Sequence, residues 1–419
     1  PFLVQRPAVA PGVEEFVLAL AAGNVAVFPG RARRGKPVVL IASPYLPFPL
    51  SHGGAVRMFN LMRRAARDYD QVLVSFSSQL EPPPAELLEM CAEIVVVRIA
   101  GSHSRPSTHR PDVVEEFDSP AFHAVLRQTA RKWKPAVAQL EFTQMAQYAR
   151  DCAPAPAILV EHDITFDLYE QLLRLGDDFD LRRELGRWRR FETTAWNGVA
   201  KVVTMSEKDR TLVPGDKGFA LANGVDLERF RPSTLEPERA RLLFIGSFAH
   251  LPNVLALEYF LREVWPLLED VRPTLHIIAG MRHEYFLDRY RERVSLDLTA
   301  PGIELQGFVS DVRPAYERAS IVIAPLVASA GTNIKILEAM AMGKAIVSTP
   351  AGINGLDLTP GSDVLVTPSP QEMASAIRSL SNNVARRKEI EQAARATVER
   401  AFDWDVIGER QSKLYASLI

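Results

Sequence analysis

Short apolar runs alternate with helical patterns along most of the chain, and this alternation restricts the fold more than any other feature. In the first half, the expected strands are 37–42, 71–76, 93–98, 136–140, 157–161 and 201–206. Helical patterns such as 55–67 and 121–133 lie between them. Because parallel strands need a crossover, usually a helix, this order predicts a parallel sheet with helices on both faces. The expected fold class is therefore α/β, of the doubly wound, Rossmann-like kind.

The pattern restarts in the second half, so we expect two domains. The chain has 419 residues, more than one hydrophobic core usually organises. A tight turn at 223–226 and a linker at 231–234 precede a new strand that ends in Gly246. The expected division is an N-terminal extension over 1–35, interpreted as ending in a solvated linker, an N-terminal domain over 36–212, a C-terminal domain over 213–402 and a last amphipathic helix over 403–419.

A strand, a polar turn and a helix follow one another over residues 321–343. We expect the helix to begin near Asn333, with Thr332 or Asn333 capping the amides of its first turn. Lys335 lies in that first turn, where the helix dipole disfavours a cation unless an anion lies between them. The simpler alternative is a solvated lysine paired with Glu338, in the weaker of the two charge orders. We favour a phosphate, because helix N-termini at strand ends bind anions readily.

A similar turn follows the first predicted strand. Gly53 and Gly54 open a helix after a long loop, and glycines there let a ligand approach the backbone amides closely. Arg57, in the first turn of this helix, is again a cation where a bound anion would be favourable. No GxGxxG occurs here, so this is not the dinucleotide fingerprint, and a purely structural turn is the alternative.

Composition and motifs argue against several classes of function. The formal net charge is -2 and no basic run alternates with aromatic residues, which argues against nucleic acid as a partner. The eight histidines form no metal-binding motif, so no metal site is expected. No apolar segment is long enough to cross a bilayer, and two cysteines without CxxC spacing fit a reducing cytoplasm. The charged stretch 165–197 is interpreted as an exposed, ion-paired face, with peripheral contact to the inner membrane face as the alternative.

The glycine turns and cations follow the carboxyl ends of strands, where open parallel sheets bind ligands, and with two domains we expect the site in the cleft between them. A ligand that suits helix N-termini together with Lys335, Arg57 and Arg282 carries a diphosphate. Glu338, one helical turn beyond the phosphate-facing end, is expected to accept hydrogen bonds from a ribose diol. The alternative for Glu338 is a charged surface residue.

At this point the sequence resembles the family 4 retaining glycosyltransferases, which have the GT-B fold. The segment 331–349 is similar to the donor-site signature of that family. The other segments that carry the resemblance follow in family-like order: Gly53-Gly54, 206–209, 223–226, 244–247 and 307–309. The resemblance covers nearly all of residues 37–419, and the ordered set is specific where most single motifs are weak.

The resemblance implies roles for residues of the C-terminal domain. Glu338 matches a glutamate that binds the donor ribose. The loop from Gly331 to Ile334 matches one whose amides meet the donor sugar and diphosphate. Phe308 and Val309 match residues whose backbone contacts the base.

Other implied donor-binding residues lie in both domains. Gly54 matches a loop that closes on the diphosphate, and His162 matches a histidine near the donor-sugar hydroxyls, although a lone histidine at a strand end is about as often structural. Ser206, Gly246 and Gly307 belong to the matching segments and are taken as donor-binding residues. The last helix is expected to cross back to the N-terminal domain.

Two positions depart from the family pattern. Ala330 stands where the first glutamate of the family's pair is expected, and 247–253 lack the family's arginine and lysine. Lys335 is placed like a lysine that carries the phosphate charge in some family members. A catalytically silent nucleotide-sugar binding module and a GT-B sugar-nucleotide epimerase are therefore the alternatives, and the epimerase would need additional carboxylates.

The expected function is retaining, metal-independent transfer of a sugar from a nucleotide-sugar donor, UDP- or GDP-linked, to a glycan, lipid-linked or small-molecule acceptor. The donor is a substrate, and no further cofactor is expected. Lys335, Arg57 and helix N-termini would stabilise the charge that develops on the departing diphosphate. No general base is evident, so the leaving phosphate would take the acceptor proton. The oligomeric state is left open.

Overall fold

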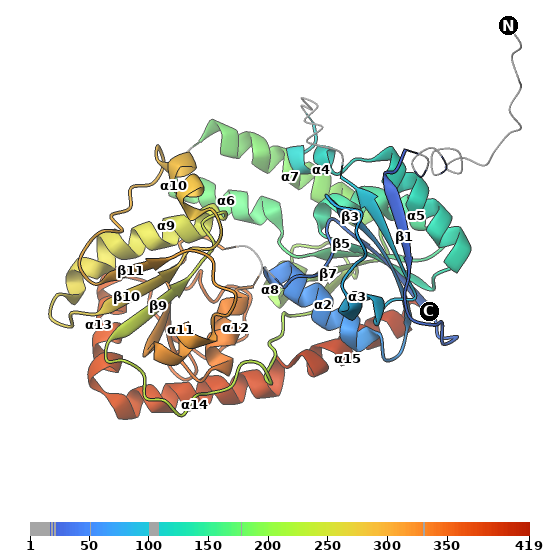
Figure 1. The fold of residues 1–419 in the computed structure, drawn as a ribbon. Coiled ribbons are helices and arrows are strands. Elements are labelled where there is room, and N and C mark those ends of the chain that lie inside the picture. Colours follow the sequence, from blue (N-terminus) through green and yellow to red (C-terminus); the bar gives the residue numbers. More distant parts are fainter. Residues whose placement is uncertain are drawn as a thin grey trace, which may run out of the picture. The chain divides into compact units, whose positions relative to one another are not determined.

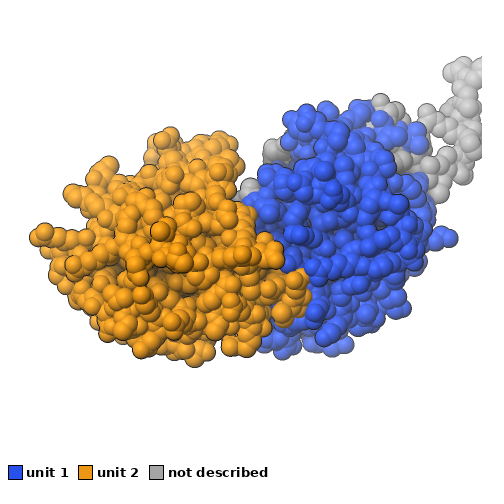
Figure 2. Space-filling model, turned by 60° about the horizontal axis from the view of Figure 1, so that its bottom comes forward, with its two compact units in different colours: residues 1–221, 407–419 blue, residues 222–406 orange. Residues whose placement is uncertain are grey.

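The computed structural model describes residues 17, 20, 22–50, 52–99, 109–176, 178–329 and 332–419. The chain divides into two compact units, coloured separately in Figure 2. Unit 1 comprises residues up to Leu221 together with Ile407–Ile419, and unit 2 comprises Ala222–Val406. Each unit contains a sheet of mainly parallel strands with helices packed on it, which confirms the predicted α/β class (Figure 1).

The sheet of unit 1 has strand order β1-β4-β3-β2-β5-β6-β7-β8. Its strands are β1 (Val25–Pro29), β2 (Val38–Ser43), β3 (Asp70–Ser77), β4 (Glu93–Arg98), β5 (Val137–Glu141), β6 (Ala157–Glu161), β7 (Lys201–Thr204) and β8 (Gly218–Ala220). Every neighbouring pair is parallel except β1 with β4. All residues of β2 and β5 are buried, as expected for central strands covered on both faces.

Helices of unit 1 connect these strands. They are α2 (Gly53–Ala65), α3 (Ala85–Leu88), α4 (Asp112–Glu116), α5 (Pro120–Trp133), a 3-10 segment (Thr143–Cys152), α6 (Thr165–Leu175), α7 (Phe179–Asn197) and α8 (Glu207–Arg210). The last helix, α15 (Trp404–Ala416), brings the chain back to unit 1 at Ile407. There Tyr415 packs edge to face on Tyr69, with ring centroids 5.2 Å apart.

The structure differs from the predicted domain limits at both ends of the first domain. Part of the predicted extension is β1, an edge strand in which Val25 is buried and Val27 exposed. The segment 32–35 that follows is exposed, as predicted for a solvated linker, but it also contacts a buried acid. Arg34 donates its backbone N–H to the Asp70 carboxylate at 3.1 Å. At the other end, β8 pairs with β7, so unit 1 extends to Leu221, past the predicted limit at 212.

The sheet of unit 2 has strand order β11-β10-β9-β12-β13-β14, and every neighbouring pair is parallel. Its strands are β9 (Arg241–Ile245), β10 (Thr274–Ile278), β11 (Ile303–Gln306), β12 (Ile321–Ala324), β13 (Ala345–Ser348) and β14 (Leu365–Val366). Its helices are α9 (Leu251–Tyr259), extended by segments 260–264 and 265–268, α10 (His283–Tyr290), α11 (Arg313–Arg318), α12 (Ile334–Ala341), α13 (Pro370–Asn382) and α14 (Val384–Ala401).

Successive residues of the unit 2 strands enter different cores, as the side-chain alternation of a strand requires. Leu242 of β9 packs with residues of α9 and α13, whereas Leu243 packs with residues of α11, α12 and α14. The sheet is therefore covered on both faces. Over the part of the chain that the structure describes, no helix combines the length and the apolar character needed to cross a membrane.

Candidate functional site

Each sheet reverses its strand order at one place, and some of the candidate residues follow the strands at these places. In unit 1 the reversal lies between β2 and β5, and in unit 2 between β9 and β12. Ligands of open parallel sheets bind outside the carboxyl ends of the strands at such a point. The loop before α12 follows β12, and Gly246 follows β9.

In unit 2, α12 begins at Ile334, so the predicted start near Asn333 is confirmed. Asn333 is the N-cap residue, but its side chain makes no capping hydrogen bond. Thr332 instead accepts a hydrogen bond from the Asn223 amide, with 2.7 Å between Nδ2 and Oγ1. Side chains therefore hold the turn in place without capping the first amides of the helix. Ala330 and Gly331, which the resemblance singles out, lie outside the described residues.

Lys335 projects from the first turn of α12 into a narrow cavity. The cavity is lined by Phe244, Ile245, Asn253, Tyr316, Val322, Ile323, Ala324, Leu326, Asn333, Lys335 and Ile336. Lys335 is half-buried, and its ammonium forms no hydrogen bond or ion pair with any other described residue. Burial lowers the pKa of Lys335, and the charge of Glu338 opposes this shift. The predicted alternative of a paired surface lysine therefore does not describe the geometry.

Glu338 lies one turn along the same helix and is also half-buried. The hydroxyl of Tyr316 donates to Glu338 Oε2 at 3.1 Å. Burial raises the pKa of the Glu338 carboxyl, while Lys335 and the hydrogen bond from Tyr316 act against it. Tyr316 is completely buried and was not among the predicted site residues, because nothing in its local sequence marks it.

Phe308 and Val309 follow β11 and line a hollow of about 480 Å³ in unit 2. Polar groups of His276, Gln306, Ser310, Asp311 and Arg318 share its wall with Ile278, Pro314 and Ala315. The Phe308 ring is 54% exposed, which leaves a planar apolar face open to a ligand. A hollow with one aromatic face and several polar edges suits a planar, hydrogen-bonding ring.

Two of the predicted glycines of unit 2 lie so close to aromatic side chains that a Cβ atom would be crowded. A Cβ at Gly246 would be 2.8 Å from the Phe244 ring, and a Cβ at Gly307 would be 3.2 Å from the His283 ring. Arg282 adopts the left-handed conformation before α10 and extends over the Tyr285 ring at 4.6 Å. The role of Arg282 in binding a diphosphate stays a prediction.

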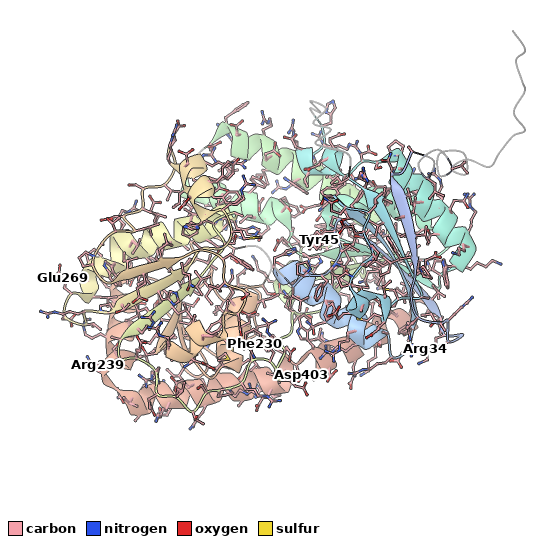
Figure 3. All side chains as sticks on the ribbon, viewed as in Figure 1. Arg34, Tyr45, Phe230, Arg239, Glu269 and Asp403 are labelled. Carbon is pink, nitrogen blue, oxygen red and sulfur yellow. The ribbon has the colours of Figure 1, made fainter. Side chains whose placement is uncertain are left out.

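In unit 1, an aromatic stack follows the carboxyl ends of β2, β5 and β6. Phe142 lies flat on the His162 ring, with centroids 3.7 Å apart and planes at 6°. Tyr45, labelled in Figure 3, contacts Phe142 on one side and His52 at the start of α2 on the other. Phe142 has a φ of 72°, a strained value for a residue with a large side chain, and such strain often marks functional positions.

Gly54 packs against this stack, which brings two of the predicted residues of unit 1 together. A Cβ at Gly54 would lie 2.5 Å from the Tyr45 hydroxyl and 2.6 Å from the tip of the Phe142 ring. The glycine is therefore required by packing in the free protein, besides any approach of a ligand to its amide.

Glu141 is a functional candidate in unit 1 that sequence reasoning missed. Its Oε2 lies 2.7 Å from His162 Nε2, and Glu141 is only 3% exposed. The available signal was positional: Glu141 ends β5 and His162 follows the end of β6, and these strands are parallel neighbours. Side chains at adjacent carboxyl ends of such a sheet converge on one edge.

Two predicted residues of unit 1 have structural roles. Arg57 is 1% exposed and donates to the Leu221 carbonyl at 2.9 Å, so the predicted contact with a diphosphate finds no support. Ser206 is 4% exposed and caps α8 by accepting from the Asp209 amide at 3.0 Å. Gly53 is the first residue of α2 and is exposed. Among the described residues there is no group of three or more potential metal ligands.

Replacing Gly54 with alanine is expected to destabilise the protein by about 1–3 kcal/mol, because the new methyl group would overpack against Tyr45 and Phe142. Gly186→Ala in α7 is the matched control, since a Cβ there meets no atom within 4 Å. The control should gain up to about 1 kcal/mol from helix propensity. Chemical unfolding of both variants measures the difference, and equal stability of Gly54→Ala and the wild type would contradict the packing role.

Comparison with known proteins finds similarity over part of the chain. Residues 239–383 match the family described as glycosyl transferases group 1. A GDP-mannose-dependent monoacylated alpha-(1-6)-phosphatidylinositol monomannoside mannosyltransferase of Corynebacterium glutamicum is 26% identical over 217 residues, which make up 47% of this chain and 55% of that protein.

Two solved structures share the fold across nearly the whole chain. Sucrose-phosphate synthase of Thermosynechococcus elongatus matches with a TM-score of 0.69 and 16% identity, over 91% of this chain and 99% of that one. The HepE protein of Anabaena in complex with UDP-glucose matches with a TM-score of 0.64 and 15% identity, over 90% and 99%. The expected GT-B fold is thereby confirmed, and the family match of residues 239–383 confirms glycosyltransferase as the class of enzyme.

Proposed function

We propose that this glycosyltransferase moves a sugar, with retention of its anomeric configuration and without a metal ion, from a UDP- or GDP-linked donor to a glycan, lipid-linked or small-molecule acceptor. The proposal needs no cofactor beyond the donor itself. The described residues that bear on the donor belong to unit 2, and those that bear on the transferred sugar belong to unit 1.

The ammonium of Lys335, which has no hydrogen-bond or ion-pair partner among the described residues, is the observation that carries the proposal. A half-buried cation in the first turn of a helix is unfavourable, because both desolvation and the helix dipole act against it. A diphosphate at this place would pair with the ammonium and with the uncapped amides before and within the first turn of α12. The same contacts would stabilise the charge that develops when the nucleoside diphosphate leaves.

The neighbouring residues suit the nucleoside. Glu338 keeps an oxygen, Oε1, that accepts no hydrogen bond from a described residue, so a ribose diol can donate to it. The hollow beside Phe308 and Val309 has the size and mixed polarity that a nucleobase needs. Relatives support both candidate bases, because one is named for its dependence on GDP-mannose and another structure contains UDP-glucose.

The chemistry follows from the groups available. The bond between the sugar C1 and the diphosphate oxygen breaks, and the acceptor oxygen bonds to C1 from the same face. The acceptor proton passes to the departing phosphate oxygen, so no separate base is required. His162, held between Phe142 and Glu141, would hydrogen bond a hydroxyl of the transferred sugar and fix the ring for attack.

A panel of UDP- and GDP-sugars tests the proposal. Calorimetry of the purified chain in EDTA should show binding of one nucleotide series. Incubation with a mixed acceptor pool should then yield a glycoside with the donor's anomeric configuration, measured by mass spectrometry and proton NMR. Binding without transfer or hydrolysis would instead identify a silent binding module, and an altered nucleotide sugar would identify an epimerase.

A further inference from the structure

Four buried polar side chains link the C-terminal helix α15 to His162 within unit 1. The Gln411 amide donates to the Tyr415 hydroxyl at 2.7 Å, and that hydroxyl donates to Gln139 Oε1 at 2.6 Å. The Gln139 amide donates to Glu141 Oε1 at 2.6 Å. The other oxygen of Glu141 meets His162 Nε2 at 2.7 Å. A continuous hydrogen-bonded chain therefore runs from α15 through β5 to the histidine.

The side chains of this hydrogen-bonded chain are buried, and burying polar groups costs free energy unless they are hydrogen-bonded. Gln139, Glu141, Gln411 and Tyr415 are each at most 4% exposed. A buried polar network is as stable as an apolar core only when its members are satisfied, and satisfied networks fix one arrangement of their side chains. Here the carboxylate receives one donor on each oxygen, so its position is determined from both sides.

Arg57 supplies a buried positive charge beside this network. The guanidinium is as deeply buried as the network, and its charge interacts with both Glu141 and Tyr415. Burial lowers the pKa of Arg57 to about 10, opposed by Glu141, so the side chain is still a cation near pH 7. Arg57, which the sequence analysis expected to contact a phosphate, thus interacts with Glu141, the partner of His162.

The geometry determines which nitrogen of His162 faces a ligand. A carboxylate can only accept, so Nε2 carries the proton and donates to Glu141. The other nitrogen, Nδ1, is then an acceptor in the neutral ring, and it has no hydrogen-bond partner among the described residues. Phe142, stacked flat on the ring, prevents it from tilting.

We propose that Glu141 is a positioning residue that holds His162 with Nδ1 as the acceptor for a hydroxyl of the sugar, and that Gln139 and Tyr415 anchor Glu141 to α15. The proposal rests on the proposed function, because it takes His162 to contact the transferred sugar. It assigns α15 a part in catalysis through the hydrogen bonds of Tyr415, in addition to its packing.

The tautomer can be tested without any assay of transfer. The chain has eight histidines, so a protein labelled with 15N in histidine gives a tractable spectrum, and loss of signals in His162→Gln assigns the residue. The wild type should show His162 protonated at Nε2. In Glu141→Gln the side chain at 141 can donate as well as accept, so the Nε2-protonated form should lose its dominance. The same tautomer in both proteins would overturn the positioning role.

Kinetics then test the link to α15. Glu141→Gln should lower kcat about 10- to 100-fold, the usual cost when a histidine loses the partner that fixes it, with a smaller change in the donor KM. Tyr415→Phe should lower kcat about fivefold, the value of one hydrogen bond. Its effect should vanish in the Glu141→Gln background, because the two residues act through one chain.

Tyr69→Phe is the matched control for Tyr415→Phe. The Tyr69 hydroxyl donates to the Ser412 carbonyl of α15 at 3.1 Å, and the Tyr69 ring packs on Tyr415. Tyr69 is not a member of the hydrogen-bonded chain that leads to His162. Each variant loses one hydroxyl group that forms a hydrogen bond to or from α15, so similar losses of thermal stability are expected. Only Tyr415→Phe should reduce kcat. Equal kcat in the two would overturn the link. If the wild type transfers no sugar, the proposed function fails while the NMR result on Glu141 stands by itself.

Discussion

Lys335→Met should bind nucleoside diphosphate about 100-fold more weakly than the wild type, and the free protein should become more stable. Loss of a charge-assisted hydrogen bond to phosphate accounts for a change of this size in affinity. The gain in stability follows because a half-buried ammonium that has no partner among the described residues opposes folding, as the lowered pKa of Lys335 indicates. The gain is expected to be about 0.5–2 kcal/mol. Calorimetry with UDP and GDP, and thermal unfolding without ligand, measure the two effects.

Lys344→Met provides the matched control. Lys344 is 5% exposed, and burial lowers its pKa as well, but its ammonium donates to the Glu317 carbonyl at 3.1 Å. Its replacement should leave nucleotide affinity unchanged and should reduce stability, because that carbonyl loses its partner. Unchanged affinity in Lys335→Met, or the same stability change in both variants, would refute the assignment of Lys335 to phosphate.

The features that the sequence predicted well are those encoded by local pattern. Apolar runs and helical spacing gave the α/β class, and the polar turn before Ile334 gave the start of α12. Lys335 stood out because one principle, the helix dipole, makes its position unfavourable without an anion. Reasoning of this kind needs only neighbours along the chain.

Arg57 shows where local reasoning fails. In the sequence it is a cation in the first turn of a helix, as Lys335 is. In the structure it lies one turn before Leu61, on the face of α2 that is buried. A helix with polar residues on several sides does not reveal which side packs inward, and the packing of α2 decides that the charge is buried.

Glu141, Tyr45 and Tyr316 were missed for a second reason. Each becomes part of the site through the pairing of strands or the packing of a helix far away in sequence. Glu141 meets His162 only because β5 and β6 are neighbours in register. Tyr316 reaches Glu338 only because α11 and α12 pack on the same face of the sheet. Such contacts follow from tertiary structure, which motif spacing does not encode.

Two buried acids in unit 1, Glu161 and Glu192, should make the stability of the protein depend on pH. Glu161 is 1% exposed and accepts from the Trp196 indole at 2.7 Å and from the Thr143 hydroxyl. Burial raises the pKa of Glu161 to about 7, with Thr143 and Trp196 opposing. Burial and the charge of Glu161 together raise the pKa of Glu192 as well. Both acids therefore favour the protonated form in the folded protein.

The sign of the pH dependence follows from these shifts. Between pH 4.5 and about 7, the folded state holds a proton on Glu161 that the unfolded state has released. The contribution of Glu161 to stability is thus fully present below pH 4.5 and is lost as pH rises through about 7. The difference between a pKa of about 7 in the folded state and the ordinary value of 4.5 corresponds to about 3 kcal/mol of stability.

Glu161→Gln should therefore flatten the decline in stability between pH 5 and pH 8 and should be about 3 kcal/mol more stable than the wild type at pH 8. The glutamine can keep both contacts, because its oxygen accepts from Trp196 and its amide can donate to the Thr143 hydroxyl. Urea unfolding at several pH values measures the profile. A parallel decline in variant and wild type would show that Glu161 is already ionised in the folded protein.

Glu192→Gln should behave differently from Glu161→Gln, although the charges of the two acids interact. The Glu192 carboxylate accepts the backbone N–H groups of Thr165 at 2.7 Å and Phe166 at 3.0 Å, one on each oxygen, at the start of α6. Glutamine has only one acceptor oxygen, so one buried N–H would face an amide donor and lose its partner. This variant should also show a flatter pH profile, but with lower stability throughout. The contrast separates the cost of burying charge from the value of the hydrogen bonds, because both oxygens of Glu192 accept backbone N–H groups, whereas Glu161 accepts from a side-chain hydroxyl that can also act as an acceptor.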